Sequence, residues 1–323
     1  MVRPLYPLKF HPIFKERIWG GNKLKTFLNK PIKEENIGES WEVSDVKDNI
    51  SIVSEGELKG TSLKELLNTY GSDLVGNKNY KHFGNNFPVL IKFIDAKDDL
   101  SIQLHPNDQL AKDRHNSFGK TEMWYVMHAE EDAHLIIGFN RKMSREDYLK
   151  YLERKGLPEI MNFEKVQNGD TFFINVGRVH AIGAGIMLAE IQQTSDITYR
   201  VYDWDRVDSQ GNSRELHNEL AIDAIDFNME DDFKTKYSQS ENVSNKMVAC
   251  PYFTTNYLPV KGIISKENNK DSFIIYLCVG GRVTITYDGN DTQITMGETI
   301  LIPAALKEYR IASENAKLLE VYV

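Results

Sequence analysis

Short apolar runs separated by turn residues recur along this chain and constrain its fold more than any other feature. In the last quarter, such runs cover residues 273–279, 282–287, 293–296, 300–302 and 318–323, with Gly-Gly and Asp-Gly-Asn turns between them. Many short strands at a spacing of roughly 8–12 residues are typical of β-sandwiches and jelly-roll barrels. We therefore predict an all-β fold with a few helices on its outside.

The first two thirds show the same pattern. Residues 37–44 alternate between polar and apolar, as a half-buried strand does, and further strands are predicted at 88–94, 100–105, 170–179, 186–191 and 197–204. The runs 121–127 and 133–139 are predicted to form a hairpin across the acidic turn at 129–132.

A few segments carry helix signals instead. Ser62 and Glu65 form a capping box that predicts a helix through Tyr70, and Ser144 with Asp147 predicts a second helix that ends by Gly156. Apolar residues at helical spacing predict a third helix over 216–227, and 106–114 is predicted to hold one or two helical turns. The polar stretch 228–246 is predicted to be a domain boundary or a long surface connection.

Charge and hydropathy exclude several classes of partner. The net charge of −8 argues against nucleic acid or an anionic membrane as the main partner. No run of about 18 apolar residues predicts a transmembrane helix, and the first ten residues do not resemble a secretory signal. Two cysteines, Cys250 and Cys278, fit a reducing compartment with free thiols. These features predict a cytoplasmic protein.

Four polar residues have the spacing of a metal site. Gln103 and His105 are two apart and point to one face of an extended strand, Glu122 begins the next apolar run, and His180 follows the strand-like run 170–179. If those strands are neighbours, these side chains could converge on one divalent metal. The alternative is that both histidines are separately satisfied core residues and Glu122 is a surface carboxylate.

The motifs around these residues resemble a known family. Gly169–His180 is similar to the second motif of the cupin superfamily, with Asn175 at a position where proline is usual, and the stretch around His105 is similar to the first. Gln103 at the position of the first cupin histidine narrows the resemblance to type I mannose-6-phosphate isomerase (phosphomannose isomerase), in its short bacterial branch. The matching pieces, in chain order, are Gly38–Ser44, Gln103-x-His105-Pro106, Lys120-x-Glu122-Met123-Trp124, Gly177-x-x-His180-Ala181, Glu190 and Ser195-Asp196-x-x-x-Arg200. The chain departs from the longer enzymes around Arg200.

The resemblance implies two cupin-type jelly-roll barrels or sandwiches with peripheral helices. Residues 1–230 would form a metal-bearing catalytic domain with short helical insertions. Residues 247–323 would form a cupin-like β domain without metal, because its Gly297–Ala304 motif lacks the histidine. The resemblance also implies one zinc ion per chain, bound by Gln103, His105, Glu122 and His180. A mixed nitrogen and oxygen shell suits a catalytic zinc site, although manganese or iron would accept the same ligands.

The implied reaction interconverts D-mannose 6-phosphate and D-fructose 6-phosphate, which moves hydrogen between C1 and C2. Arg200 would hold charge on the enediolate or the phosphate, Lys120 would bind a substrate oxyanion or phosphate, and Glu190 would transfer the proton. His105 and a water molecule held by the metal compete with Glu190 for the role of base. The structural alternatives are an ion pair of Arg200 with Asp196 or Asp203, a solvated Lys120, and Glu190 as a buried partner of Arg200.

Two other functions fit the sequence. One is a related sugar-phosphate isomerase with a different epimer preference, and the other is a non-catalytic cupin that senses a sugar phosphate. Loss of a metal ligand or of Arg200 would favour the sensor. The sequence retains all four predicted metal ligands and Arg200. The expected partner is a small-molecule sugar phosphate, with no nucleic acid or membrane partner, and the chain is expected to be a monomer or a homodimer.

Overall fold

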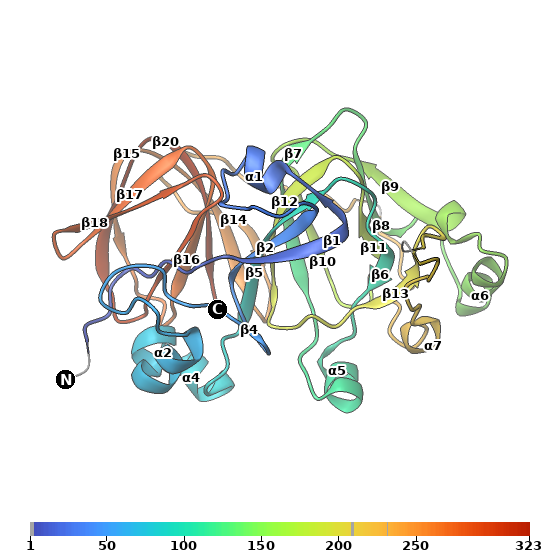
Figure 1. Ribbon diagram of the computed structural model, residues 1–323, viewed down its shortest axis with the longest axis horizontal. Helices are drawn as coiled ribbons and strands as arrows, with labels where there is room; N and C mark the ends of the chain where they lie inside the picture. The colour runs from blue at the N-terminus through green and yellow to red at the C-terminus, as the bar shows by residue number, and fades with distance from the viewer. Residues whose placement is uncertain (1–2, 208–209, 231) are drawn as a thin grey trace.

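The computed structural model describes residues 3–207, 210–230 and 232–323, and most of its regular structure is β-strand. Three large antiparallel sheets lie in two neighbouring units, with the C-terminal strands in one unit and the earlier strands in the other (Figure 1). The all-β prediction with a few peripheral helices is confirmed. The sheets are packed as sandwiches and do not close into barrels.

The first unit contains a six-stranded and a five-stranded sheet. In spatial order the six-stranded sheet consists of β1 (Ile13–Gly21), β2 (Ile37–Val43), β5 (Val89–Ala96), β12 (Ile186–Gln193), β7 (Glu122–Ala129) and β10 (Thr171–Ile174). The five-stranded sheet consists of β13 (Tyr199–Tyr202), β6 (Ile102–Leu104), β11 (His180–Ile182), β8 (His134–Phe139) and β9 (Met161–Lys165). A small ribbon pairs β3 (Asp45–Val46) with β4 (Asn49–Ile50).

The second unit is a seven-stranded sheet built from the C-terminal part of the chain. Its strands are β14 (Asn245–Ala249), β15 (Thr254–Glu267), β16 (Ile274–Gly280), β17 (Arg282–Tyr287), β18 (Asn290–Thr295), β19 (Thr299–Ile302) and β20 (Glu308–Tyr322). The long strands β15 and β20 pair along almost their whole length and form the backbone of this unit.

The six-stranded sheet is buried on both faces, which explains why β5 and β12 are buried at every residue. One face packs against the five-stranded sheet through a core that includes Trp124 of β7 and Ile182 of β11. The other face packs against the seven-stranded sheet through a core that includes Ile91 of β5 and Leu301 of β19. The central strands are therefore dense in apolar residues on both sides, apart from the polar residues described below.

The predicted hairpin over 121–139 is wrong. Its two strands form as β7 and β8, but β7 pairs with β12 and β10 in the six-stranded sheet, while β8 pairs with β11 and β9 in the five-stranded sheet. The acidic turn between them carries the chain from one layer of the sandwich to the other. Both strands are apolar because each faces a sandwich core, and this pattern does not distinguish a hairpin from a change of sheet.

The helices lie at the periphery (Figure 1): α1 (Lys23–Thr26), α2 (Leu63–Tyr70), α3 (Ser72–Val75), α4 (Asn77–Phe83), α5 (Asp108–His115), α6 (Arg145–Glu153) and α7 (Asn218–Ala221), with a 3₁₀ turn at Leu157–Ile160. The capping box of Ser62 and Glu65 is confirmed, as is the Ser144 cap of α6. The helix predicted over 216–227 is limited to α7. Beyond it the Asp226 amide donates to the Gly177 carbonyl, so a tertiary hydrogen bond replaces the continuing helix.

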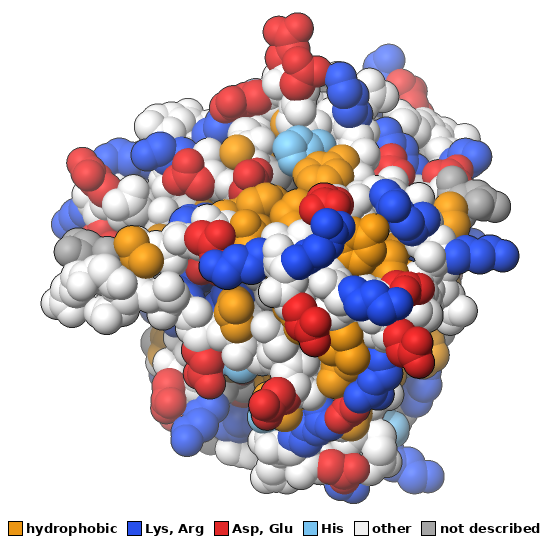
Figure 2. Space-filling view, turned by 90° about the vertical axis from the view of Figure 1, so that its right-hand side faces the viewer, with side chains coloured by type: hydrophobic (Ala, Val, Ile, Leu, Met, Phe, Trp, Pro, Cys, Tyr) orange, Lys and Arg blue, Asp and Glu red, His pale blue; other side chains and the backbone are white. Residues whose placement is uncertain are grey.

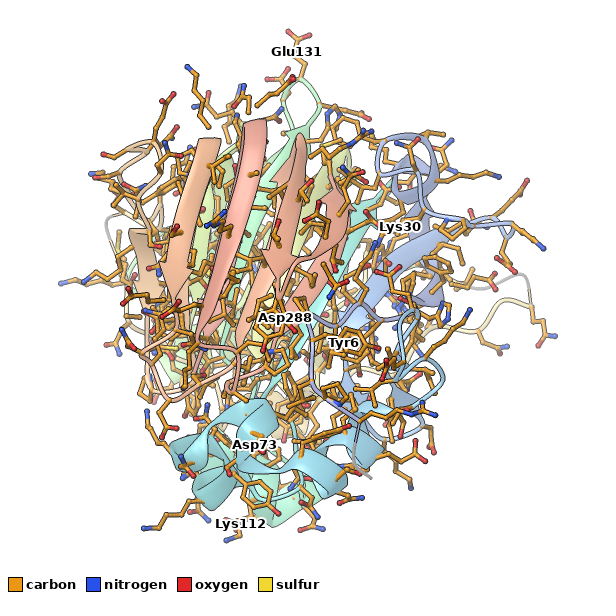
Figure 3. The ribbon with its side chains drawn as sticks, turned by 90° about the vertical axis from the view of Figure 1, so that its left-hand side faces the viewer. Tyr6, Lys30, Asp73, Lys112, Glu131 and Asp288 are labelled. Atoms are coloured by element: carbon orange, nitrogen blue, oxygen red, sulfur yellow. The ribbon has the colours of Figure 1, made fainter. Side chains whose placement is uncertain are left out.

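The N-terminal segment crosses to the C-terminal unit. Leu8 exchanges two backbone hydrogen bonds of 2.8 Å with Leu301 of β19. Figure 3 shows Tyr6 of this segment on the same side as Asp288 in the turn between β17 and β18, and both residues line one surface hollow. The strands of the second unit all lie between residues 245 and 322. We therefore propose domains of 1–230 and 247–323 that share the core between their sheets.

The outer face of the five-stranded sheet is covered by α6 and α7 through a further apolar core. Figure 2 shows this side of the molecule, where apolar side chains are exposed among charged ones. The exposed apolar residues of the elements on this side include Leu149 of α6 and Phe163 of β9. Among the helices of the described residues, none has the length and apolar composition needed to cross a membrane.

Candidate active site

Three of the predicted metal ligands lie together in the interior of the sandwich. His105, Glu122 and His180 are buried, and the nearest ligand atoms of the three lie within 4.8 Å of one another. Nε2 of His105 is 3.4 Å from Oε2 of Glu122, and Nε2 of His180 is 3.5 Å from Oε1. These distances are longer than good hydrogen bonds, so the two rings and the carboxylate are not hydrogen-bonded to one another, and the Lys120 ammonium forms an ion pair with Oε2 of Glu122.

Each histidine is oriented by a backbone carbonyl. Nδ1 of His105 lies 2.8 Å from the Ile197 carbonyl oxygen, and Nδ1 of His180 lies 2.8 Å from that of Arg178. Because only a protonated Nδ1 can donate to a carbonyl, the Nε2 lone pair of each ring is left directed at Glu122. Backbone carbonyls commonly orient metal-binding histidines in this way. The buried donor set of two imidazole nitrogens and a carboxylate, with no hydrogen bond between them, therefore fits a divalent cation.

The charge states also fit a cation. Burial, together with the neighbouring Lys120 ammonium, lowers the pKa of His105 to about 4, although Glu122 acts in the opposite direction. Burial lowers the pKa of His180 as well. Burial alone would raise the pKa of Glu122, but Lys120 and the two histidines hold it well below its usual range. Two neutral imidazoles and a carboxylate are the forms that bind metal.

Strand pairing in the five-stranded sheet places Gln103 beside this cluster. Gln103 is paired with His180 on β11 and with Arg200 on β13, so these three residues form one row across three strands. Ser101 donates to Gln103 Oε1 at 3.4 Å, and Arg200 Nε donates to Ser101 Oγ at 3.2 Å. The structure thus brings the predicted fourth ligand and the predicted arginine next to the three-residue cluster.

A second row of polar and aromatic residues crosses the six-stranded sheet on the opposite side of the pocket. Trp41 of β2 is paired with Lys92 of β5, Lys92 with Glu190 of β12, and Glu190 with Trp124 of β7. Residues from both rows line one pocket of about 400 Å³. The site therefore lies between two facing rows, one from each sheet of the sandwich.

Glu190 is held by two neighbours in its row. Lys92 Nζ donates to its Oε1 at 2.9 Å, and Trp124 Nε1 donates to its Oε2 at 3.0 Å. The Lys92 ammonium also lies 5.2 Å from the centre of the Trp41 ring. The partner of Glu190 is thus Lys92, and the pairing with Arg200 that the sequence left open does not occur.

Lys120 is buried, with Nζ 3.1 Å from Oε2 of Glu122. Burial alone would lower the pKa of Lys120, but Glu122 and Glu190 raise it above its usual value. The alternative of a solvated lysine is therefore wrong. Lys120 lines the pocket as a charged ammonium beside the cluster of His105, Glu122 and His180.

Arg200 directs its guanidinium toward the pocket, where NH1 donates to the Glu215 carbonyl at 2.8 Å. The described residues give it no ion pair with Asp196 or Asp203. Asp203 is occupied by Arg206 and Arg214, which donate to its carboxylate at 2.5–2.7 Å. The guanidinium of Arg200 is therefore left without a carboxylate partner.

Sequence reasoning missed several residues of the pocket lining: Arg17, Glu39, Lys92, Ser101 and Arg214. Glu39 shows how tightly they are connected. Burial would raise its pKa, but Lys92 and Arg17 lower it to about 2, aided by hydrogen bonds from Arg17 and Trp41. The alternation of residues 37–43 carried a signal for Glu39 and Trp41, which share one face. Glu42 lies on the other face, paired with Lys30 at 2.6 Å.

Comparisons with known proteins agree with this geometry. Residues 7–131 match the family model "Phosphomannose isomerase type I, catalytic domain", and residues 243–323 match "Mannose-6-phosphate isomerase, cupin domain". The chain is 35% identical over 308 residues to mannose-6-phosphate isomerase ManA of Bacillus subtilis, covering 94% of this chain and 95% of that protein. It is 32% identical over 306 residues to the mannose-6-phosphate isomerase of Streptococcus mutans, with 94% of each covered.

A solved structure shows the same fold. The crystal structure of the mannose 6-phosphate isomerase from Bacillus subtilis superposes with a TM-score of 0.88 at 29% identity, covering 98% of this chain and 99% of that one. The chain therefore belongs to the type I phosphomannose isomerase family.

Proposed function

We propose that this protein is a zinc-dependent aldose–ketose isomerase that interconverts D-mannose 6-phosphate and D-fructose 6-phosphate. The single observation that carries the proposal is the pair of facing rows. A buried cation site with Gln103 and Arg200 lies on one side, and the Lys92–Glu190 pair lies on the other. The relatives are named mannose-6-phosphate isomerases, which supports mannose 6-phosphate as the substrate.

The proposed zinc ligands are Gln103, His105, Glu122 and His180. When bound, a divalent ion supplies positive charge that polarises the oxygens at C1 and C2 of the sugar. The protein holds both imidazoles neutral and Glu122 ionised, so the ligands require no change of charge to bind it. Zinc is favoured by this mixed imidazole and carboxylate set, although the set is not selective.

Glu190 is the proposed base for the proton at C2. Its two oxygens are fixed by Lys92 and Trp124, which orients the carboxylate in the pocket. His105 is less suited to this role because Nδ1 is directed at a carbonyl and Nε2 at the cation site. A positioned base of this kind contributes roughly 10²–10⁴-fold to the rate.

Lys120 and Arg200 are proposed to stabilise negative charge on the substrate. Lys120 presents a buried ammonium beside the cluster, and Arg200 presents a guanidinium without a carboxylate partner. Arg17 and Arg214 line the same pocket, but each is paired with a carboxylate, that of Glu39 and that of Asp203 respectively. The local charge of Lys120 and Arg200 opposes the net charge of −8 and would favour the phosphate of the substrate. The free cysteines Cys250 and Cys278 fit the proposed cytoplasmic location.

A coupled assay tests the proposal. Conversion of mannose 6-phosphate is measured in the purified protein, after exhaustive chelation, and after zinc is restored. We expect activity to be lost on chelation and to return with zinc, and we expect glucose 6-phosphate to be a poor substrate. Full activity in protein shown to be metal-free would refute the proposed metal requirement. No turnover with zinc present would refute mannose 6-phosphate as the substrate.

A further inference from the structure

A second concave region lies at the end of the molecule that carries the helices. This groove of about 1000 Å³ is bounded by α4, by α5 with the segment after it, and by the turn before β15. Figure 3 shows Lys112 of α5 and Asp73 of α3 at the same end of the molecule. Among the described residues, none lines both this groove and the active-site pocket.

The groove combines aromatic surface with positive charge. Phe83, Phe118 and Tyr252 contribute aromatic rings to its lining, and the Phe118 side chain is 37% exposed. Four basic side chains belong to the same lining: Lys78, Lys81, His82 and Lys112. The three lysines concentrate positive charge in a chain whose net charge, with its histidines neutral, is −8.

The acidic side chain among the described lining residues is Asp108, and its oxygens are already engaged. Oδ1 accepts from the Gly119 amide at 2.9 Å and from Gln193 Nε2 at 3.0 Å, while Oδ2 accepts from the Tyr252 hydroxyl at 2.7 Å. The four basic side chains are exposed or at the rim, so they remain able to contact an anion. Asp108 keeps its negative charge because these hydrogen-bond donors are neutral, so the lining side chains set three lysines against one carboxylate, a balance that favours an anionic molecule.

We propose that this groove binds a nucleoside phosphate, with the base against the aromatic rings and the phosphates on the lysines. A flat ring gains from stacking on aromatic side chains, and phosphate gains from lysine ammonium groups. A groove between two parts of a chain, apolar in its floor and with a few charged groups, is a common place for a small ligand. Neither the family comparisons nor the isomerase reaction accounts for this combination.

Asp108 connects the groove to the active site. Gln193, which donates to Asp108, also accepts from the Thr121 amide at 2.8 Å, and Thr121 lies between Lys120 and Glu122. A ligand that contacts Tyr252 and α5 would therefore restrain the segment 119–122. Any effect of the ligand on catalysis rests on the proposed function, but binding itself does not.

Binding is tested with the full-length, zinc-loaded protein and a fluorescent nucleoside diphosphate, mant-ADP. We expect saturable binding that is competed by ADP, and less effectively by adenosine or pyrophosphate alone. The double variant Lys81→Glu/Lys112→Glu should weaken binding at least tenfold, while the matched exposed control Lys142→Glu and the active-site variant Arg200→Ala should bind as the wild type does.

Three binding outcomes would overturn the proposal. These are no saturation at millimolar mant-ADP, loss of binding in Arg200→Ala but not in the double variant, or competition by pyrophosphate as strong as by ADP. The second outcome would place the nucleotide in the active-site pocket, and the third would show that the ring contributes nothing.

Amide hydrogen exchange tests the connection to the active site without measuring activity. We expect ADP to slow exchange at Gly119 and Thr121 in the wild type and not in the double variant. Unchanged exchange at both amides, in protein shown to be saturated with ADP, would refute the coupling.

Discussion

Arg200 combines two environments within one residue. Its backbone is fixed by hydrogen bonds in both directions with His217, and its side chain is held by Ser101 and by the Glu215 carbonyl. The hydrogen bonds with His217 fix the position of the Arg200 backbone. The Ser101 hydroxyl and the Glu215 carbonyl, both uncharged, fix the orientation of its guanidinium. A charged group that is oriented but not neutralised is well suited to stabilise negative charge that develops during a reaction.

We expect Arg200→Ala to reduce kcat by roughly 10²–10³-fold, the range found when one preorganised donor to developing charge is removed. Zinc content, measured by atomic absorption, should stay at one ion per chain because Arg200 is not a proposed ligand. Arg282→Ala, at an exposed position of β17, serves as a control and should retain full activity. Loss of zinc together with activity would show that Arg200 supports the metal site structurally.

Glu39 makes stability depend on acid pH. Its pKa is about 2 in the folded protein and near 4.5 in the unfolded chain, so its contribution to stability is present above pH 4.5 and lost as the pH falls toward 2. The difference corresponds to about 3 kcal/mol. We expect Glu39→Gln to lose this dependence between pH 5 and pH 3 in urea unfolding, whereas exposed Glu35→Gln should follow the wild type. Parallel pH curves for Glu39→Gln and wild type would contradict the assignment.

At the scale of residues, the sequence was informative where a chemical pattern is short. The two-residue spacing of Gln103 and His105 and the glycine-framed His180 predicted side chains that the structure brings together. Lys92 carried no such signal, because a lysine inside the run 88–94 becomes meaningful only when β2 and β12 are known to flank it. Cross-strand neighbours cannot be read from one sequence.

At the scale of elements, the difference between predicted and observed structure lies in pairing more than in strand position. The runs predicted at 273–279 and 282–287 form β16 and β17 with shifts of at most one residue at either end. The long strand β15 was not predicted, since Gly262 and Pro259 interrupt its pattern. The turn between β7 and β8 gave no sign that the chain changes sheet there.

The turn between β10 and β11 fixes the position of His180. Gly177 in this turn has a φ of +78°, its amide donates to the His105 carbonyl at 2.8 Å, and its carbonyl accepts from the Asp226 amide at 2.9 Å. A Cβ atom at this glycine would lie 2.4 Å from the Ala224 carbonyl oxygen. The turn thus connects the two histidines that we propose as zinc ligands through backbone alone.

Gly177→Ala should therefore destabilise the fold and weaken zinc binding. Gly289→Ala is a matched control, because Gly289 also has a positive φ, +74°, but a Cβ atom there would meet no atom of the described residues within 4 Å. We expect about 1 kcal/mol for the control and about 2–4 kcal/mol for Gly177→Ala, since a steric clash adds to backbone strain. Equal losses of unfolding free energy and equal zinc affinity in the two variants would contradict this role of the turn.

At the scale of the whole molecule, the six-stranded sheet is a shared middle layer. Its strands contribute one face to the catalytic pocket and the other to the core with the C-terminal sheet. The site and the C-terminal unit are therefore supported by the same strands, although the active-site pocket is lined by residues of the first unit.

We expect the zinc-loaded protein to unfold in one cooperative transition, because separating the two units would expose the core between them. Leu301→Ala, in the C-terminal unit, should lower the unfolding free energy by about 2–5 kcal/mol, as for other large-to-small core substitutions. Calorimetry should show a single peak that moves as a whole in the variant. Two separate peaks would show independent domains if Leu301→Ala shifts only the peak of the C-terminal unit.

The contact between Leu8 and Leu301 has a consequence for synthesis on the ribosome. The two residues are 293 positions apart, so at about 5–20 residues per second the N-terminal segment waits roughly 15–60 s for its partner to be translated. Once β12, the last strand of the six-stranded sheet in the chain, has been made, one apolar face of that sheet has nothing to cover it until the C-terminal strands follow. A newly made chain of this kind should depend on chaperones until its last strands emerge.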